Sequence, residues 1–107
     1  MGEFEQIVLL ALLRIGEGAY GMRARREIER LTGRDVAIGA IYTTLARLER
    51  KGWVRHRMGD PSPERGGRAK KHFQVTPEGI SALEDTRQAL DVMWDGVRLR
   101  RGGAEPS

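Results

Sequence analysis

Apolar residues recur at helical spacing along the first fifteen positions of the chain. Steps of three and four predict a helix over Glu3 to Ile15. Leu9, Leu10 and Leu13 lie outside the main stripe, so this helix is apolar on more than one side and needs cover on more than one side. A second copy of the chain or the rest of the same domain could cover these sides, and this helix alone does not distinguish the two. The stripe consists of Phe4, Ile7, Val8, Ala11, Leu12 and Ile15.

Two further helices are predicted between glycine-marked turns. Gly16 and Gly18 end the first helix, and the second runs from about Tyr20 to Leu31. The third runs from about Ile38 to Lys51 and stops at Gly52, as expected of a glycine at a helix C-terminus. Core positions of the second helix are Met22, Ile28 and Leu31, and those of the third are Ile38, Ile41, Leu45 and Leu48.

The outward face of the third helix is small near its start and basic later. A helix that enters a DNA major groove needs little bulk near the bases and donors directed at phosphates and base edges. The alternative is an ordinary amphipathic helix whose polar face meets water. The outward residues are Gly39, Thr43, Ala46, Arg47 and Arg50, with Tyr42 and Thr44 on the flanks.

A hairpin is predicted next, from strands over 53–58 and 70–76 whose inward residues are Val54, Phe73 and Val75. The segment between the strands is rich in Gly, Pro and Ser, which predicts an irregular loop. Its arginines, and the two lysines that follow, suit a minor groove or a line of phosphates. A solvated connector is the alternative. These four cations are Arg65, Arg68, Lys70 and Lys71.

The last helix has a strong start signal, because Thr76 supplies a hydroxyl N-cap, Pro77 follows, and Glu78 suits the positive end of the helix dipole. We expect it to reach about Arg98, with a narrow seam at heptad spacing that predicts a dimer contact. A helix packed on its own domain is the alternative. Residues 102–107 form a polar tail that we expect to be disordered. The seam is Ile80, Leu83, Arg87, Leu90, Trp94 and Val97.

Composition narrows the function classes. A net charge of +4 and a pI of about 10.1 favour a polyanion, an acidic membrane or an acidic protein as the partner. There is no cysteine, which excludes disulfides, and the apolar run Ile7 to Leu13 is too short to span a bilayer, so we expect a cytoplasmic protein. His56 and His72 alone make a poor metal site. No phosphate loop or nucleophile–base–acid set is present, so we expect no enzyme activity and no cofactor.

The order helix, helix, helix, basic hairpin, helix predicts a mainly α fold with a small β-hairpin. This is a winged helix-turn-helix followed by a C-terminal dimerisation helix. We divide the chain into a DNA-binding domain over 1–76, whose first helix shares the dimer interface, and a dimerisation helix over 77–101. A dimer would hold two recognition helices about one DNA turn apart, over a palindrome-like operator.

Three segments carry a resemblance to a known family. "GAYGMRARREIE", "VAIGAIYTTLARLERKGWV" and "GGRAKKHFQVTPEGISAL" resemble the PadR family of bacterial transcription regulators, over nearly the whole chain. The resemblance implies a dimeric winged-helix repressor joined through its first and last helices, acting on stress, detoxification or efflux genes. Some family members release DNA when they bind small aromatic compounds.

Two residues depart from the family pattern. Ala37 stands where Ser or Thr usually caps the third helix, a loss that costs on the order of 1 kcal/mol and predicts a shifted or looser helix start. Thr43 stands where many members have Pro, so base contacts inferred from other members do not transfer directly. Tyr42 contacts a phosphate by analogy with the family, or else bonds within the domain.

The predicted sites follow from these patterns. Trp94 has two possible roles, and both stay open. The indoles of two copies could stack on either side of a flat aromatic effector, or they could simply pack against each other in the interface. The alternative function is a winged-helix module that binds an acidic protein or RNA, with no operator. Predicted DNA contacts are Gly39, Tyr42, Thr43, Thr44, Arg47, Arg50 and Lys51 from the third helix, with Arg65, Arg68, Lys70 and Lys71 from the wing. The predicted dimer interface is Leu9, Leu10, Leu13, Ile80, Leu83, Arg87, Leu90, Trp94 and Val97.

Overall fold

The computed structural model describes residues 1–59 and 70–101, which form four helices and one antiparallel hairpin. This arrangement confirms the predicted mainly helical fold with a small hairpin. None of these helices is both long and apolar enough to cross a membrane. The elements are α1 (Glu3–Ile15), α2 (Gly21–Thr32), α3 (Ile38–Arg50), β1 (Val54–Met58), β2 (Lys71–Val75) and α4 (Pro77–Trp94).

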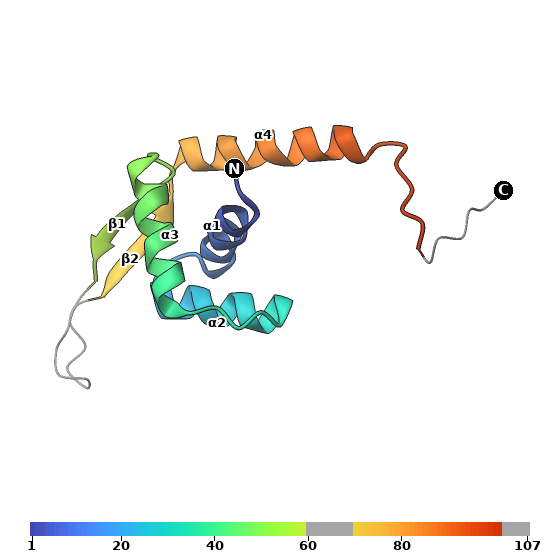
Figure 1. Ribbon diagram of the computed structural model, residues 1–107. Coiled ribbons are helices and arrows are strands. Elements are labelled where there is room, and N and C mark those ends of the chain that lie inside the picture. The colour runs from blue at the N-terminus through green and yellow to red at the C-terminus, as the bar shows by residue number, and fades with distance from the viewer. Residues whose placement is uncertain (60–69, 102–107) are drawn as a thin grey trace.

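Helix α1 lies at the centre of the domain, with α2, α3 and α4 around it (Figure 1). Its buried apolar side chains are those of Val8, Leu9, Ala11 and Leu12. Leu9 is fully buried within its own chain, so the prediction that it lies in a dimer interface is wrong. The domain itself supplies the cover for this side of α1.

The second and third helices pack on α1 through short apolar faces. Ala24 and Ile28 are buried on α2. Ile41, Leu45 and Leu48 are buried on α3, as their spacing predicts. Leu31 differs from the prediction, because it lies at the end of α2 and remains exposed.

The hairpin closes the other side of the core. Val54 pairs with Val75 and His56 with Phe73, and the apolar members of these pairs are buried. The Phe73 N–H donates to the Ala19 carbonyl at 2.7 Å, which holds β2 against the α1–α2 turn. His72 pairs with Arg57, so strand alternation places the two histidines on opposite faces of the hairpin rather than facing each other.

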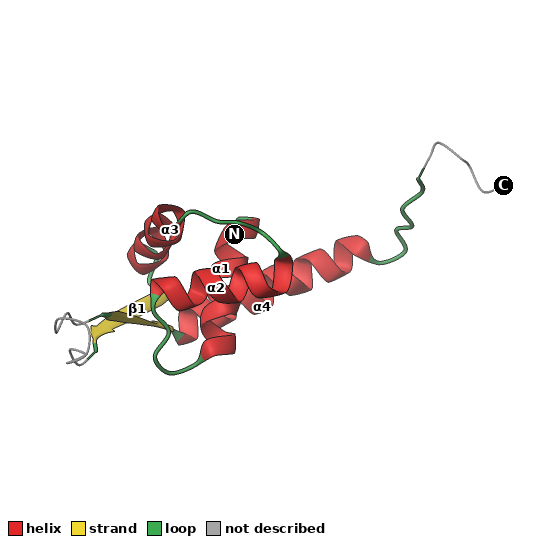
Figure 2. Ribbon diagram, turned by 90° about the horizontal axis from the view of Figure 1, so that it is seen from below, coloured by secondary structure: helices red, strands yellow, loops and turns green. Residues whose placement is uncertain are grey.

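Helix α4 is joined to the domain by hydrogen bonds at its first turn and by Leu83, which packs against the core. Thr76 Oγ1 accepts the Gly79 N–H at 3.1 Å and donates to the Gly52 carbonyl at 2.6 Å. Gly79 is the one buried residue of α4, and the helix then projects past the other elements (Figures 1 and 2). It ends at Trp94 rather than near Arg98, because Asp95 leaves the helical conformation with a ψ of 125° and Gly96 follows with a positive φ of 77°.

Candidate nucleic-acid interface

The exposed face of α3 has the composition that the sequence predicts. Gly39, Thr43, Arg47 and Arg50 are all exposed and lie opposite the buried stripe of the same helix. At Gly39 the surface is open, since an added Cβ would meet no atom within 4 Å. The face is therefore flat and small near the start of α3 and cationic near its end.

Two residues of the predicted DNA-contacting set have other roles in the structure. Thr44 is only 4% exposed, so it is packed on the inner side of α3 and cannot meet a base. Lys51 Nζ lies 2.8 Å from Glu5 Oε2, so its ammonium group is committed to a contact within the chain. The prediction for Thr44 is wrong. The Lys51 side chain is still 39% exposed, so its DNA contact stays a prediction, for an ammonium group that is already paired within the chain.

Tyr42 lies where α3 meets the first turn of α2. A Cβ added at Gly21 would lie 2.5 Å from the Tyr42 Cζ, so the ring rests directly on the Gly21 backbone. The Tyr42 side chain nevertheless stays 46% exposed. Glycine at position 21 therefore lets the phenol approach the backbone of α2 closely, beside the exposed face of α3.

The hairpin adds a group of cations next to this face. Lys70 Nζ lies 4.1 Å from the centre of the Tyr20 ring, and Lys71 is exposed. Arg65 and Arg68, also predicted to contact DNA, lie outside the described residues. Arg55 and Arg57 are exposed on β1 and were missed by the sequence prediction, although their period-two alternation with buried Val54 places them on the outer face.

Helix α3 and the hairpin form one continuous end of the molecule, opposite the free end of α4 (Figures 1 and 2). The His56 Nδ1 makes a short hydrogen bond with a carboxylate oxygen of Glu49, which ties β1 to the last turn of α3. The His56 ring also packs against Phe73. The helix face and the cationic strands are thus held in a fixed relationship.

A second candidate surface is a groove between α1 and α4 with a volume of about 540 Å³. Leu10, Leu90 and Trp94 in this groove are 48%, 46% and 52% exposed. Val97 follows the end of α4, so its predicted place on a helical seam is wrong. The predicted interface residues that the structure brings together along this groove are Leu10, Leu13, Ile80, Leu83, Arg87, Leu90 and Trp94.

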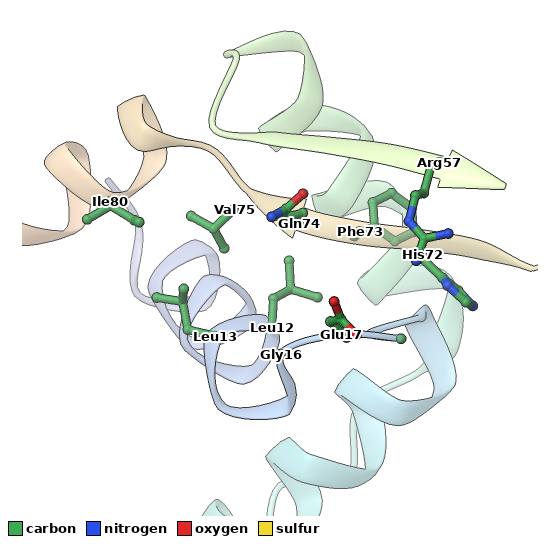
Figure 3. A pocket seen from close by; sticks show the side chains of 11 residues that line it. Leu12, Leu13, Gly16, Glu17, Arg57, His72, Phe73, Gln74, Val75 and Ile80 are labelled. Carbon is green, nitrogen blue, oxygen red and sulfur yellow. The ribbon is translucent and has the colours of Figure 1, made fainter. Parts of the chain in front are cut away.

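A further cavity of about 380 Å³ lies between the end of α1 and β2. Figure 3 shows Leu12, Leu13 and Val75 at one end and Arg57 with His72 at the other. Across residues 1–59 and 70–101, no group of three or more His, Cys, Asp or Glu side chains is placed to hold a metal ion. The lining of this cavity mixes aliphatic and polar side chains without a catalytic arrangement.

Comparison with known protein families gives one match. Residues 9–85 match the model of the "transcriptional regulator PadR-like family", which is more than half of the chain. No curated protein is similar enough to the chain to count as a relative.

Solved structures with the same fold include three that cover most of the chain. A PadR-like transcriptional regulator from Bacillus cereus is 21% identical, with a TM-score of 0.68 over 86% of this chain and 84% of its own. A PadR family transcriptional regulator from Eggerthella lenta is 24% identical, with a TM-score of 0.69 over 88% and 81%. F93 from STIV, a winged-helix DNA-binding protein, is 19% identical, with a TM-score of 0.69 over 92% and 98%.

Proposed function

The chain belongs to the PadR-like family of transcriptional regulators, and from this premise we propose that it binds a palindrome-like DNA operator as a homodimer and represses a stress, detoxification or efflux gene. The family is one of DNA-binding regulators rather than enzymes. The observation that carries the proposal is the small and then cationic face of α3 beside the cationic hairpin. The proposed compartment is the cytoplasm, where the chain has access to chromosomal DNA.

In the proposed complex, α3 lies in the major groove. Gly39 and Thr43 face the base edges, because an open glycine allows close approach and a hydroxyl both donates and accepts hydrogen bonds. Arg47 and Arg50 on the same face hold the phosphates, and Tyr42 adds a hydroxyl from its flank. The proposed wing contacts come from Lys70 and Lys71, and we add Arg55 and Arg57 because both are exposed on β1.

The exposed apolar groove supports the dimer. An 18-residue helix with a single buried residue leaves its apolar side chains in water unless another surface covers them. The groove carries Leu10 and Leu13 from α1 together with the seam of α4. A second copy packed here buries the same residues on both chains, as a two-fold interface requires.

DNA binding provides the direct test. A randomised duplex library selected with the wild-type protein supplies the probe, and a shuffled duplex of the same length supplies the reference. Each of Arg47→Ala and Arg50→Ala should weaken binding to both duplexes and reduce the magnitude of the salt slope by about one. Arg26→Ala, which removes an exposed cation from α2, is the matched control. Failure of the wild type to select any sequence would contradict operator binding and favour the protein-binding or RNA-binding alternative.

The groove also supports an effector site at Trp94. Its half-exposed indole lies among Leu90, Arg87 and Asp91, and two such indoles across a two-fold axis could stack on a flat aromatic molecule. Titration with planar cationic dyes should quench the Trp94 fluorescence, with Trp94→Phe as the control that retains only Trp53. Unchanged fluorescence with several dye types contradicts this part of the proposal.

A further inference from the structure

The start of α3 lacks the side-chain cap that a helix of this role usually has. Ala37 is the N-cap residue and takes φ and ψ of −64° and 138°, the extended conformation that an N-cap residue adopts. It has no side-chain oxygen to accept a hydrogen bond, and the first turn of α3 carries no acidic residue. Nevertheless α3 begins at Ile38, where the periodicity predicts.

An arginine from α2 reaches across to this start. Arg25 Nε donates to the Val36 carbonyl at 2.6 Å, and Arg25 Nη2 donates to Asp35 Oδ1 at 3.0 Å. The Val36 carbonyl belongs to the planar peptide unit that leads into Ala37. A donor held on that oxygen therefore fixes the orientation of the peptide from which the helix begins.

The two bonds of Arg25 are not equivalent. Asp35 is 88% exposed, and an ion pair in water contributes little. The bond to Val36 is part-buried, and the Arg25 side chain is only 28% exposed, so this charge-assisted bond is the stronger of the two. The effect of Arg25 should therefore act through the backbone of the loop rather than through Asp35.

The rest of the α2–α3 loop is held from the other side. The Arg34 guanidinium group donates two hydrogen bonds to the Glu3 carboxylate of α1, at 3.1 and 3.2 Å. The backbone N–H of Arg34 donates to Thr32 Oγ1 at 3.1 Å. This anchor lies at the beginning of the loop. Arg25 is the contact at its end, directly before α3.

We propose that Arg25 is a positioning residue for the recognition helix α3, because it holds the peptide that leads into the uncapped helix start at Ala37. It orders the first turn of α3 before DNA arrives, and so it keeps Gly39 and Thr43 in register with the bases. Its effect on DNA binding rests on the proposed function of α3, whereas its effect on the helix start does not.

Three single variants separate this role from general effects. Arg25→Met should raise amide exchange at Ala40 and Ile41, whose N–H groups donate to the Ala37 carbonyl at 3.0 and 3.3 Å, by roughly fivefold. It should also weaken binding to the selected duplex about fivefold, with a smaller effect on the shuffled duplex. Arg26→Met, the same charge change on the next residue, and Asp35→Asn should leave the exchange rates and the ratio of the two affinities unchanged.

A second-site variant provides the decisive readout. Ala37→Ser adds a hydroxyl that accepts a backbone N–H of the first turn, and position 37 is exposed, so the hydroxyl has room. In this background Arg25→Met should change the exchange rates and the affinity by less than about twofold. A merely structural role for Arg25 would instead lower the melting temperature equally with and without the Ala37→Ser substitution.

The outcomes distinguish the two proposals. If the wild type selects no DNA sequence, operator binding fails, and amide exchange in the free protein still decides the role of Arg25. If Arg25→Met leaves exchange at Ala40 and Ile41 unchanged, the positioning role is overturned. It is equally overturned if Ala37→Ser gives no rescue, so that the two substitutions are simply additive.

Discussion

Lys51 and Glu5 join the end of α3 to the start of α1 through an ion pair of 2.8 Å between Nζ and Oε2. The Glu5 carboxylate also accepts the Gly2 N–H at 3.1 Å and is almost wholly buried. The Lys51 hydrogen bond lowers the pKa of Glu5, burial opposes that shift, and the Gly2 hydrogen bond adds to it. The ionised form of Glu5 is therefore favoured in the folded chain.

This pair predicts a pH dependence of stability. The folded-state pKa of Glu5 lies below its ordinary value of 4.5, so the pair's contribution is fully present above that value and is lost as pH falls through the lowered pKa. Glu5→Gln should reduce the free energy of unfolding at about pH 6 and much less at about pH 3. Urea unfolding at both pH values measures this, and a loss independent of pH would contradict it.

Removing the other partner should cost more, because it leaves the buried carboxylate without its cation. Lys51→Met should lower the free energy of unfolding by on the order of 2 kcal/mol. Lys71→Met, at an exposed lysine of β2, is the control and should change stability little. Equal stability of the two variants in urea would show that the Lys51–Glu5 contact contributes nothing.

Substitution by alanine should change the stability of the fold in opposite directions at Gly79 and at Gly39. A Cβ at Gly79 would lie 2.3 Å from the Trp53 carbonyl oxygen, so Gly79→Ala should destabilise the fold by on the order of 2 kcal/mol. Gly39 has open space around it, and Gly39→Ala should stabilise α3 by up to about 1 kcal/mol. Thermal unfolding of the two variants measures both signs.

Gly39→Ala carries a second expectation. Its added methyl would stand on the face proposed to meet the bases, so the more stable variant should bind the selected duplex more weakly. Unchanged or tighter binding would place the bases away from Gly39.

Much of the fold could be predicted because its boundaries are marked locally. Gly16 and Gly52 follow the ends of α1 and α3, and Thr76 caps α4. The end of α4 was misplaced because Leu90, Trp94 and Val97 continue the heptad spacing beyond Gly96. The positive φ of Gly96 outweighs that spacing.

The candidate site was predicted less completely, because its errors depend on contacts between distant segments. Spacing along one helix does not determine how wide its buried face is, which is why the sequence wrongly predicts that Leu9 and Thr44 are accessible. From the composition alone Lys51 is one more cation that could contact DNA. In the structure its ammonium group pairs with Glu5, which lies 46 positions earlier in the sequence. The hydrogen bond from Arg25 to the Val36 carbonyl likewise requires the packed turn between α2 and α3.

A substitution at Tyr42 tests whether the flank of α3 takes part in DNA binding. Tyr42→Phe keeps the ring that packs on Gly21 and removes only the hydroxyl. If that hydroxyl meets a phosphate, affinity for the selected and shuffled duplexes should fall together by about three- to tenfold, with unchanged thermal stability. A loss of stability with unchanged DNA affinity would assign the hydroxyl to a bond within the domain.

The groove between α1 and α4 predicts a change in association state. Leu90→Glu places a charge in the proposed two-fold contact and should convert the proposed dimer into monomers of 12.0 kDa. Val92→Glu is the matched control, because Val92 is 67% exposed on the same helix and does not line the groove. Sedimentation equilibrium measures the association state of the two variants. A Leu90→Glu variant that remains dimeric would exclude this groove as the dimer interface.

The hydroxyl of Thr76 has a mechanical consequence. It bonds the Gly52 carbonyl and the Gly79 N–H at the same time, while the Thr76 N–H bonds the Trp53 carbonyl. The root of α4 and the base of the hairpin therefore share one hydrogen-bonded joint. Because the hairpin is also tied to the α1–α2 turn through Phe73 and to α3 through His56, a change in the direction of α4 against the domain has to bend the helix beyond this joint or break the bonds of Thr76.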